Sequence, residues 1–329
     1  MAAAVSEATL TLLAPAQQAL FEAVVQPLVF AAGQGALLED AFDATGWFVL
    51  GLLQLAVLVA VIGPLQRWRP VEPVTDRPAI RVDVIYTLIH QLGLFRLLVF
   101  FSVDPLADTL TGWLALQGLG AWQLDQVFAP WWPGVTDTAL AAFLAYLLVL
   151  DLADYGIHRA QHRFGWWWAL HALHHSQRQM TMWSDNRNHL LDDLLRDGLL
   201  ALLAQFIGVP PGQFIAVVVC GQLLESLSHA NLRLGFGAVG ERLLVSPRFH
   251  RLHHSIGLGH ESQGPGSLGG HNFAVLFPVW DLIFGTANFE HRYDPTGIRD
   301  QLPGHGGRDY GRGFWAQQWL GLLRIAGRQ

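Results

Sequence analysis

The stretch His158–Ser176, HRAQHRFGWWWALHALHHS, carries five histidines and three consecutive tryptophans and follows directly on a long apolar run. On a helix, residues three and four positions apart share a face, so this spacing aims several imidazoles in one direction. Imidazole is a common metal ligand, and tryptophan is enriched where a bilayer meets water. The stretch therefore predicts a metal site on a helix that leaves a membrane, with the tryptophans as an interfacial belt.

The composition also indicates a membrane protein. Hydrophobic residues make up 52% of the 329 residues and charged residues only 14%, against about a quarter charged in soluble domains. So few charges cannot cover a soluble surface. The single cysteine, Cys220, excludes a disulfide framework and a cysteine-rich metal site, and the net charge of -6 gives no reason to expect nucleic-acid binding.

Three segments are expected to cross the membrane. Trp47–Leu65 has no charged residue and approaches the roughly 20 residues needed to span a bilayer core. Val84–Val103 is the second candidate, although His90 and Arg96 within it are costly in lipid unless they face protein or water. Thr138–Leu150 is the third, and it is expected to continue as a helix into the histidine-rich stretch.

Gly198–Leu227 is expected to form a re-entrant helical hairpin, because Pro210-Pro211-Gly212 interrupts it and leaves two short apolar arms. Gly112–Trp132, rich in tryptophan, is expected to lie at a membrane interface. The glycine-rich piece 257–270 is expected to be a flexible loop that reshapes substrate entry.

The arginines predict the orientation of the chain. Residues 1–45 and 104–137 contain none, whereas 66–83 carry four, 155–193 carry four and 228–329 carry ten. Because basic residues concentrate on the cytoplasmic side, the histidine clusters are expected to face the cytoplasm. The protein is expected to be an integral protein of a bacterial inner membrane.

These features predict an all-α polytopic membrane protein with about three transmembrane helices, a re-entrant hairpin and a cytoplasmic helical cap that holds a histidine-rich di-metal site. The chain is expected to form one membrane-embedded domain with three regions. They are the N-terminal membrane region 1–137, the histidine-rich catalytic region 138–290 and the C-terminal cytoplasmic tail 291–329.

The histidines form three clusters whose spacing suits helical faces. A zinc site closes with four ligands, or with three and a water, so eight imidazoles are too many for one ion and suggest two metal ions with open positions. The cluster residues are His158 and His162, then His171, His174 and His175, then His250, His253 and His254.

Other residues are candidates for the same site. Glu225 and His229 are four residues apart and could supply one more ligand to each metal. Asp154 precedes His158 by four residues and is expected to accept the second N–H of a ligating imidazole. His189 is expected either to bind metal or to hydrogen-bond a ligand.

Rival interpretations predict other patterns. A haem cytochrome would place single histidines deep in separate spans, and the motifs HExxH, GxSxG and Walker A are absent from the sequence. A membrane metal transporter would have ionisable residues along its spans, where only His90 and Arg96 stand. A non-catalytic scaffold would be expected to have lost some of the clustered histidines.

Taken together, the motifs resemble the fatty acid hydroxylase/sterol desaturase superfamily of integral membrane oxygenases. The resemblance runs from about Leu140 to Asn288 and rests on five motifs in the family's order: DYGIHRAQH, ALHALHHS, SHANL, SPRFHRLHHS and WDLIFGT. It implies two iron ions, with zinc possible in purified protein, that use O2 to hydroxylate a C–H bond of an acyl chain, sterol or alkyl-lipid. Desaturation by the same centre is the alternative.

The resemblance also implies a ligand set and a partner. Electrons would come from an external reductase, ferredoxin, cytochrome b5-like protein or pterin. Glu225 stands where some relatives have histidine, and Leu190 follows His189 where relatives often have proline, so both roles stay open. The implied ligands are His158, His162, His171, His174, His175, His229, His250, His253 and His254.

Overall fold

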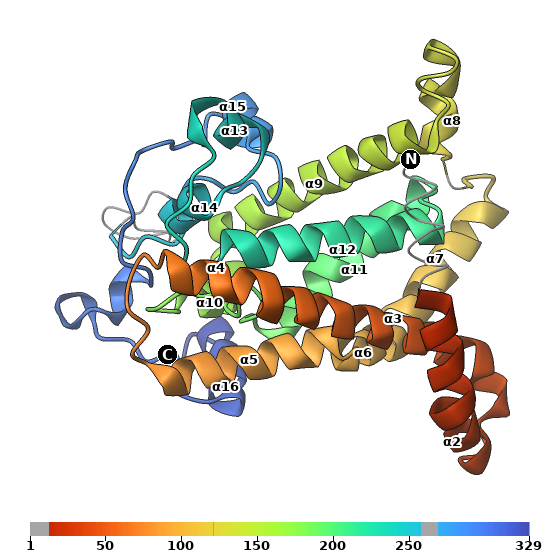
Figure 1. Ribbon diagram of the computed structural model, residues 1–329, viewed down its shortest axis with the longest axis horizontal. Coiled ribbons are helices and arrows are strands. Elements are labelled where there is room, and N and C mark those ends of the chain that lie inside the picture. The colour runs from red at the N-terminus through yellow and green to blue at the C-terminus, as the bar shows by residue number, and fades with distance from the viewer. Residues whose placement is uncertain (1–12, 121, 258–268, 329) are drawn as a thin grey trace. The chain divides into compact units, whose positions relative to one another are not determined.

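A computed structural model describes residues 13–120, 122–257 and 269–328 of the chain (Figure 1). Among these residues there is no β-strand, only an isolated antiparallel bridge between Ser255 and Thr296. The predicted all-α class is therefore confirmed. Most of the expected glycine-rich loop 257–270 lies outside the described residues.

The first expected span is part of one long apolar helical segment, Gly35–Trp68. Two α-helices, α3 (Leu38–Val57) and α4 (Gly63–Trp68), are joined by a short π-helical stretch, η3 (Leu58–Ile62). Pro64 has no N–H to donate to the preceding turn, so regular α-helical bonding is interrupted just before it.

The other two spans also match helices of the structure. Helix α9 (Ala139–Arg163) is apolar and long enough to cross a membrane and runs on to the first histidine cluster. Helices α5 (Arg77–Gln91) and α6 (Leu94–Ser102) together form a third candidate, bent by 53° where Gly93 adopts a left-handed conformation. The chain is thus a polytopic membrane protein.

The expected hairpin is present as α11 (Leu190–Phe206) and α12 (Pro211–Ser228). Proline is favoured in the first turn of a helix, which suits Pro211 at the start of α12. The turn before it is held by the backbone N–H of Trp122, which donates to the carbonyl oxygen of Phe206 at 2.8 Å.

Shorter helices complete the described part of the chain. The remaining α-helices are α2 (Gln26–Ala31), α7 (Asp104–Leu116), α8 (Leu124–Phe128), α10 (Gly165–His175), α13 (Gly237–Leu243), α14 (Pro247–His253), α15 (Val279–Phe284) and α16 (Phe314–Ile325). Single helical turns are η1 (Phe21–Val25), η2 (Gly35–Leu37), η4 (Ala129–Trp131), η5 (Arg299–Gln301) and η6 (Pro303–His305).

By its internal contacts the chain divides into two compact units. The first comprises Met1–Val57, Leu88–Leu147 and Leu202–Val219, and the second comprises Leu58–Thr87, Leu148–Ala201 and Cys220–Gln329. Every residue proposed for the metal site belongs to the second unit. The long helices α5, α9, α11 and α12 each run through both.

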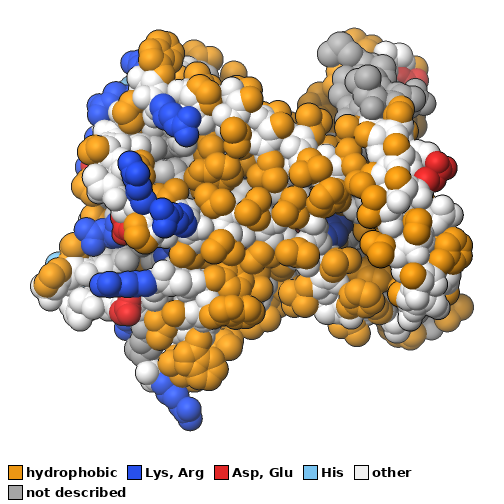
Figure 2. Space-filling view, turned by 60° about the horizontal axis from the view of Figure 1, so that its bottom comes forward, with side chains coloured by type: hydrophobic (Ala, Val, Ile, Leu, Met, Phe, Trp, Pro, Cys, Tyr) orange, Lys and Arg blue, Asp and Glu red, His pale blue; other side chains and the backbone are white. Residues whose placement is uncertain are grey.

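Hydrophobic side chains cover much of the face seen in Figure 2, where arginines are grouped mainly toward one edge. Leu52, Val59 and Val61 of the first span are among the exposed apolar residues. Soluble proteins rarely expose apolar patches of this extent, whereas a lipid-facing surface requires them. The surface therefore agrees with an integral membrane protein.

The second unit packs apolar side chains on both sides of α10. Trp168 and Ala172 pack with Ile298 and Tyr310, whereas Leu173 packs in a separate cluster. Trp168 and its neighbour Trp167 are buried, and only Trp166 is half exposed. The expected belt of three interfacial tryptophans is therefore wrong for two of them, because tertiary packing buries these rings in the protein core.

Candidate metal centre

Two short helices present the two HxxHH motifs. Helix α10 follows α9 after a single connecting residue, Phe164, so the first two histidine clusters lie on consecutive helices. Helix α14 begins after Ser246, whose side-chain oxygen accepts the backbone N–H of Phe249 at 3.1 Å. That N-cap and Pro247 at the first helical position fix where the third cluster begins.

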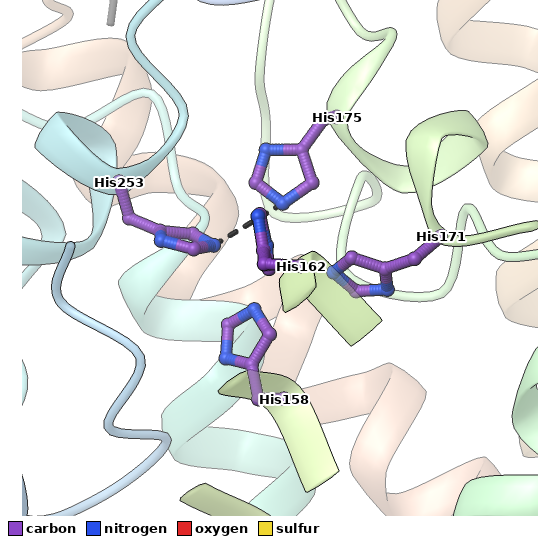
Figure 3. A group of neighbouring side chains, drawn as sticks. All are labelled: His158, His162, His171, His175 and His253. Carbon is purple, nitrogen blue, oxygen red and sulfur yellow. Dashed lines mark hydrogen bonds between the residues drawn. The ribbon is translucent and has the colours of Figure 1, made fainter. Parts of the chain in front are cut away.

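The structure brings nine histidines together in two buried groups, and Figure 3 shows five of them with their rings turned toward one another. Within each group the candidate ligand atoms all lie within 4.8 Å of one another. The five-histidine group consists of His158, His162, His171, His175 and His253, and the four-histidine group of His174, His229, His250 and His254.

Each HxxHH motif divides its histidines between the groups in the same manner. The first and last histidines, one helical turn apart, enter one group, and the middle histidine enters the other. Helix α10 gives the pair His171 and His175 to the five-histidine group, whereas α14 gives that group only its middle residue, His253. Both groups therefore depend on the docking of the same two helices.

Backbone carbonyls fix the tautomers of several rings. Nδ1 of His158 lies 2.8 Å from the carbonyl oxygen of Phe273, and Nδ1 of His253 lies 2.6 Å from that of His271. A carbonyl oxygen can only accept, so each Nδ1 carries the proton and each Nε2 keeps its lone pair. This is the arrangement found around histidines that bind metals.

The same arrangement recurs in the four-histidine group. Nδ1 of His229 donates to the carbonyl oxygen of Glu225 at 2.7 Å. Its Nε2 lies 3.1 Å from Nε2 of His174 and 2.9 Å from Nε2 of His250. Three ring nitrogens are thus held against one another in a protein interior.

These spacings fit a shared metal ion. Two ligands with metal–nitrogen bonds of about 2.0–2.1 Å and bond angles of about 90–109° lie roughly 2.8–3.4 Å apart. Nε2 of His253 and Nε2 of His175 in the five-histidine group are 3.1 Å apart, within that range. In addition, Nε2 of His158 and Nε2 of His171 are buried without a hydrogen-bond partner, as expected of nitrogens that bind metal.

Burial disfavours the protonated form of several of these imidazoles. All nine are between 0% and 7% exposed. Burial, reinforced by neighbouring histidines, lowers the pKa of His174, His250 and His253 well below the usual value. Burial likewise lowers the pKa of His229 from 6.5 to about 4. Neutral imidazole is the form that binds a metal ion.

Asp192 supports the five-histidine group, although no sequence pattern predicted this role. Its carboxylate accepts hydrogen bonds from Gln161 Nε2 at 2.8 Å, Trp167 Nε1 at 2.7 Å and His171 Nδ1 at 3.0 Å. The last bond keeps the lone pair of His171 on Nε2, facing the group. Asp192 therefore performs the task that the sequence predicted for Asp154.

The motif WDLIFGT supports the site from a distance. Asp281 within it accepts the backbone N–H groups of Phe273 and Ala274, both at 2.9 Å. This holds in place the carbonyl oxygen to which His158 donates. Asp151 of α9 accepts a further bond from Trp280 Nε1 of the same motif, at 2.7 Å.

Asp154 and Glu225 have a different partner from those expected. Arg196 of α11 makes a two-pronged contact with Asp154 and donates to both carboxylate oxygens of Glu225, at 3.3 and 3.2 Å. The expected bond between Asp154 and an imidazole is not observed, since Nδ1 of His158 faces a carbonyl instead. A guanidinium attracts carboxylates more strongly than a neutral ring does.

His189 lies outside both groups. Its Nε2 donates to the carbonyl oxygen of Gln318 at 2.9 Å, and its Nδ1 accepts the backbone N–H of Leu191 at 3.2 Å. Both ring nitrogens of His189 therefore form hydrogen bonds, which connect α16 to the start of α11. The structure thus places it neither among the ligands nor in hydrogen-bond contact with one.

Comparison with known proteins agrees with this arrangement. The family model for fatty acid hydroxylase matches residues 143–286, which include both histidine groups and Asp281. No solved structure gives a significant match to the chain.

Three relatives illustrate the range of similarity. The ornithine lipid hydroxylase OlsE of Rhizobium tropici is 24% identical over 252 residues, which cover 77% of this chain and 70% of that protein. Alkylglycerol monooxygenases of Caenorhabditis elegans and Homo sapiens are each 27% identical, over 45% and 65% of this chain. The matches span only 27% and 43% of those longer proteins.

The ordered histidine motifs, the all-helical membrane fold and these matches lead to one conclusion. Residues 143–286 match the fatty acid hydroxylase family, and the chain is similar to membrane lipid hydroxylases and monooxygenases of the fatty acid hydroxylase/sterol desaturase superfamily.

Proposed function

We propose that this protein hydroxylates a C–H bond of a membrane lipid with O2 at a centre of two iron ions. The observation that carries the proposal is the division of nine buried histidines into two adjoining groups. In both groups, ring nitrogens face one another at 2.9 to 3.1 Å. Imidazole suits iron, although it also binds zinc, copper and nickel.

The five-histidine group would hold one ion and the four-histidine group the other. Bound iron would supply the oxidising power to break an unactivated C–H bond, which is beyond protein side chains. The chain itself fixes each ring through its outer nitrogen, as carbonyls do for His158 and His229 and as Asp192 does for His171. Burial of all nine rings keeps bulk water from the nitrogens.

The substrate class follows from the membrane location and the relatives. A centre at the end of membrane-spanning α9 would allow a lipid to reach it from the bilayer. Relatives named for ornithine lipid and alkylglycerol support an acyl chain, sterol or alkyl-lipid as substrate. Their names as a hydroxylase and monooxygenases favour hydroxylation over desaturation.

Orientation and electron supply complete the proposal. The arginine-rich segments support a centre that faces the cytoplasm, in a bacterial inner membrane. The sequence has no Walker A motif, and the described residues form no β-strand that could begin a dinucleotide-binding unit. An external reductase, ferredoxin, cytochrome b5-like protein or pterin would therefore supply electrons.

The first prediction concerns the product. In membranes of cells that express the chain with an electron donor, lipids should gain one oxygen atom, and growth under isotopically labelled O2 should transfer the label to them. His174→Ala should abolish the product, because the four-histidine group loses a ligand. His291→Ala, at an exposed residue, is the matched control and should not change it. Mass spectrometry of total lipids is the measurement.

An unlabelled product would refute the use of O2 as the oxygen source. Loss of two hydrogens without gain of oxygen would establish desaturation in place of hydroxylation. If the His174→Ala variant still formed the product, the proposed metal centre could not be the site of the reaction.

The second prediction concerns metal content. The purified wild-type chain should carry two metal ions, measured by elemental analysis against protein concentration. His254→Ala should lower the ratio toward one, because only the four-histidine group is damaged. A single ion in the wild-type protein, or none in the variant, would contradict the proposal that each histidine group binds one metal ion independently.

The third prediction concerns Asp192. In the Asp192→Asn variant, the side-chain oxygen can still accept hydrogen bonds from Gln161 and Trp167. The NH2 group of the new amide then faces Nδ1 of His171. The ring would then move its proton to Nε2 and lose its ligating lone pair. Metal affinity of one site should fall roughly 10–100-fold, the usual cost of losing such a partner.

Chelator competition measures this affinity. Asp197→Asn on the same helix, where the side chain is 44% exposed, is the control. If Asp192→Asn retained both ions as tightly as the control, the tautomer argument would fail.

The fourth prediction separates two roles for Glu225. If Glu225 serves only as a partner of Arg196, the Glu225→Gln variant should keep two metal ions and lose about 1–3 kcal/mol of stability. If Glu225 is a metal ligand, the variant should instead lose one ion. Glu290→Gln, an exposed pair with Arg292, is the control for thermal unfolding. Elemental analysis and the unfolding midpoint together decide between the roles.

A further inference from the structure

Helix α16 near the C-terminus has its apolar face turned outward. Trp315 and Trp319 are 79% and 60% exposed, and Leu322 and Ile325 are 42% and 41% exposed. Their spacing of three and four residues places them along one side of the helix. A surface helix of a soluble protein has the opposite arrangement, with its apolar side toward the core.

The opposite face of α16 is polar and buried. The backbone oxygen of Gln318 accepts a hydrogen bond from His189 Nε2 at 2.9 Å. The side-chain amide of Gln318 donates to the hydroxyl of Tyr86, also at 2.9 Å. Arg324 Nε donates to the carbonyl oxygen of Ala169 in α10 at 2.9 Å. These bonds fix the rotation of α16 about its axis, so the folded chain keeps its tryptophans outside.

Close packing reinforces this rotation. Gly321 faces the ring of His189 so closely that a Cβ atom there would collide with it. Phe314 at the start of α16 packs with Val82 and Tyr86 of α5 and with Leu173 of α10. The C-terminal segment, expected as a cytoplasmic tail, thus includes a helix built into the second unit.

The neighbouring elements indicate what covers the exposed face. Helix α5, which lies beside α16 in Figure 1, begins a candidate membrane span. Arg77 and Arg81 in the first turns of α5 are exposed, as are Arg312 and Arg328 on either side of α16. Arginines flanking an apolar tryptophan-bearing helix are typical of a helix that lies in a membrane interface.

We propose that α16 lies in the plane of the membrane, with Trp315 and Trp319 inserted at the boundary between lipid headgroups and acyl chains. The ligand of this surface is the bilayer itself, with anionic headgroups near Arg312 and Arg328. The proposal goes beyond lipid hydroxylation and does not depend on it. Its consequence is that bilayer contact braces α10, the helix that carries three of the clustered histidines.

The test measures the surroundings of α16 directly. The full-length chain with Cys220→Ala, which removes its single cysteine, carries Trp319→Cys labelled with the fluorophore NBD. It is reconstituted in nanodiscs of phosphatidylcholine and phosphatidylglycerol. The matched control carries the label at Arg308→Cys, an exposed position before α16. Doxyl-labelled lipid reports lipid contact, and iodide reports contact with water.

At position 319 we expect strong quenching by doxyl lipid and iodide quenching roughly threefold or more weaker than at position 308. Equal iodide quenching at both positions would show that α16 faces water and would overturn the proposal. Protection from both quenchers would mean that protein covers the helix, and particle masses showing two chains per nanodisc would identify a second copy as the occupant. Either result excludes the bilayer. Leu322→Cys provides a second label on the same face if Trp319→Cys fails to fold.

Discussion

The fold depends on imidazole lone pairs that are forced to face one another. Carbonyl oxygens hold the protons of His158, His229 and His253 on the outer nitrogens, so the inner nitrogens can only accept. Several such buried rings repel one another unless a cation or a donated proton lies between them. Burial disfavours protonation of these rings, so in the proposed centre a metal ion would be the charge that resolves this repulsion, and its binding energy would contribute to folding.

Because each HxxHH motif contributes histidines to both groups, the facing imidazoles link the positions of the two helices that carry these motifs. Helices α10 and α14 both supply ligands to both groups, so neither group can assemble until the two helices are docked. The carbonyls that orient the rings come from the segment His271–Phe273, which Asp281 holds by its backbone. The motif WDLIFGT, far from the histidines in sequence, is therefore part of the same construction.

Sequence periodicity predicted the helical class, the apolar spans and the three clusters, because each is a local pattern. The division into five and four histidines was not predictable, since it depends on how separate helices dock. Asp192 was missed because its three donors come from α9 and α10, distant in sequence. Trp167 and Trp168 appeared interfacial because tryptophans beside an apolar run resemble an anchor until the core around them is known.

Arg196 explains why carboxylates one helical turn from the site need not act as ligands. Asp154 precedes His158 by one turn, and Glu225 precedes His229 by one turn, so both carboxylates lie near the metal groups. Free carboxylates there would compete with imidazole for iron. The guanidinium contacts both acids, so in the proposed centre the nine histidine rings would remain as the inward-facing donors. A charge placed in this way would select the ligands without touching the metal.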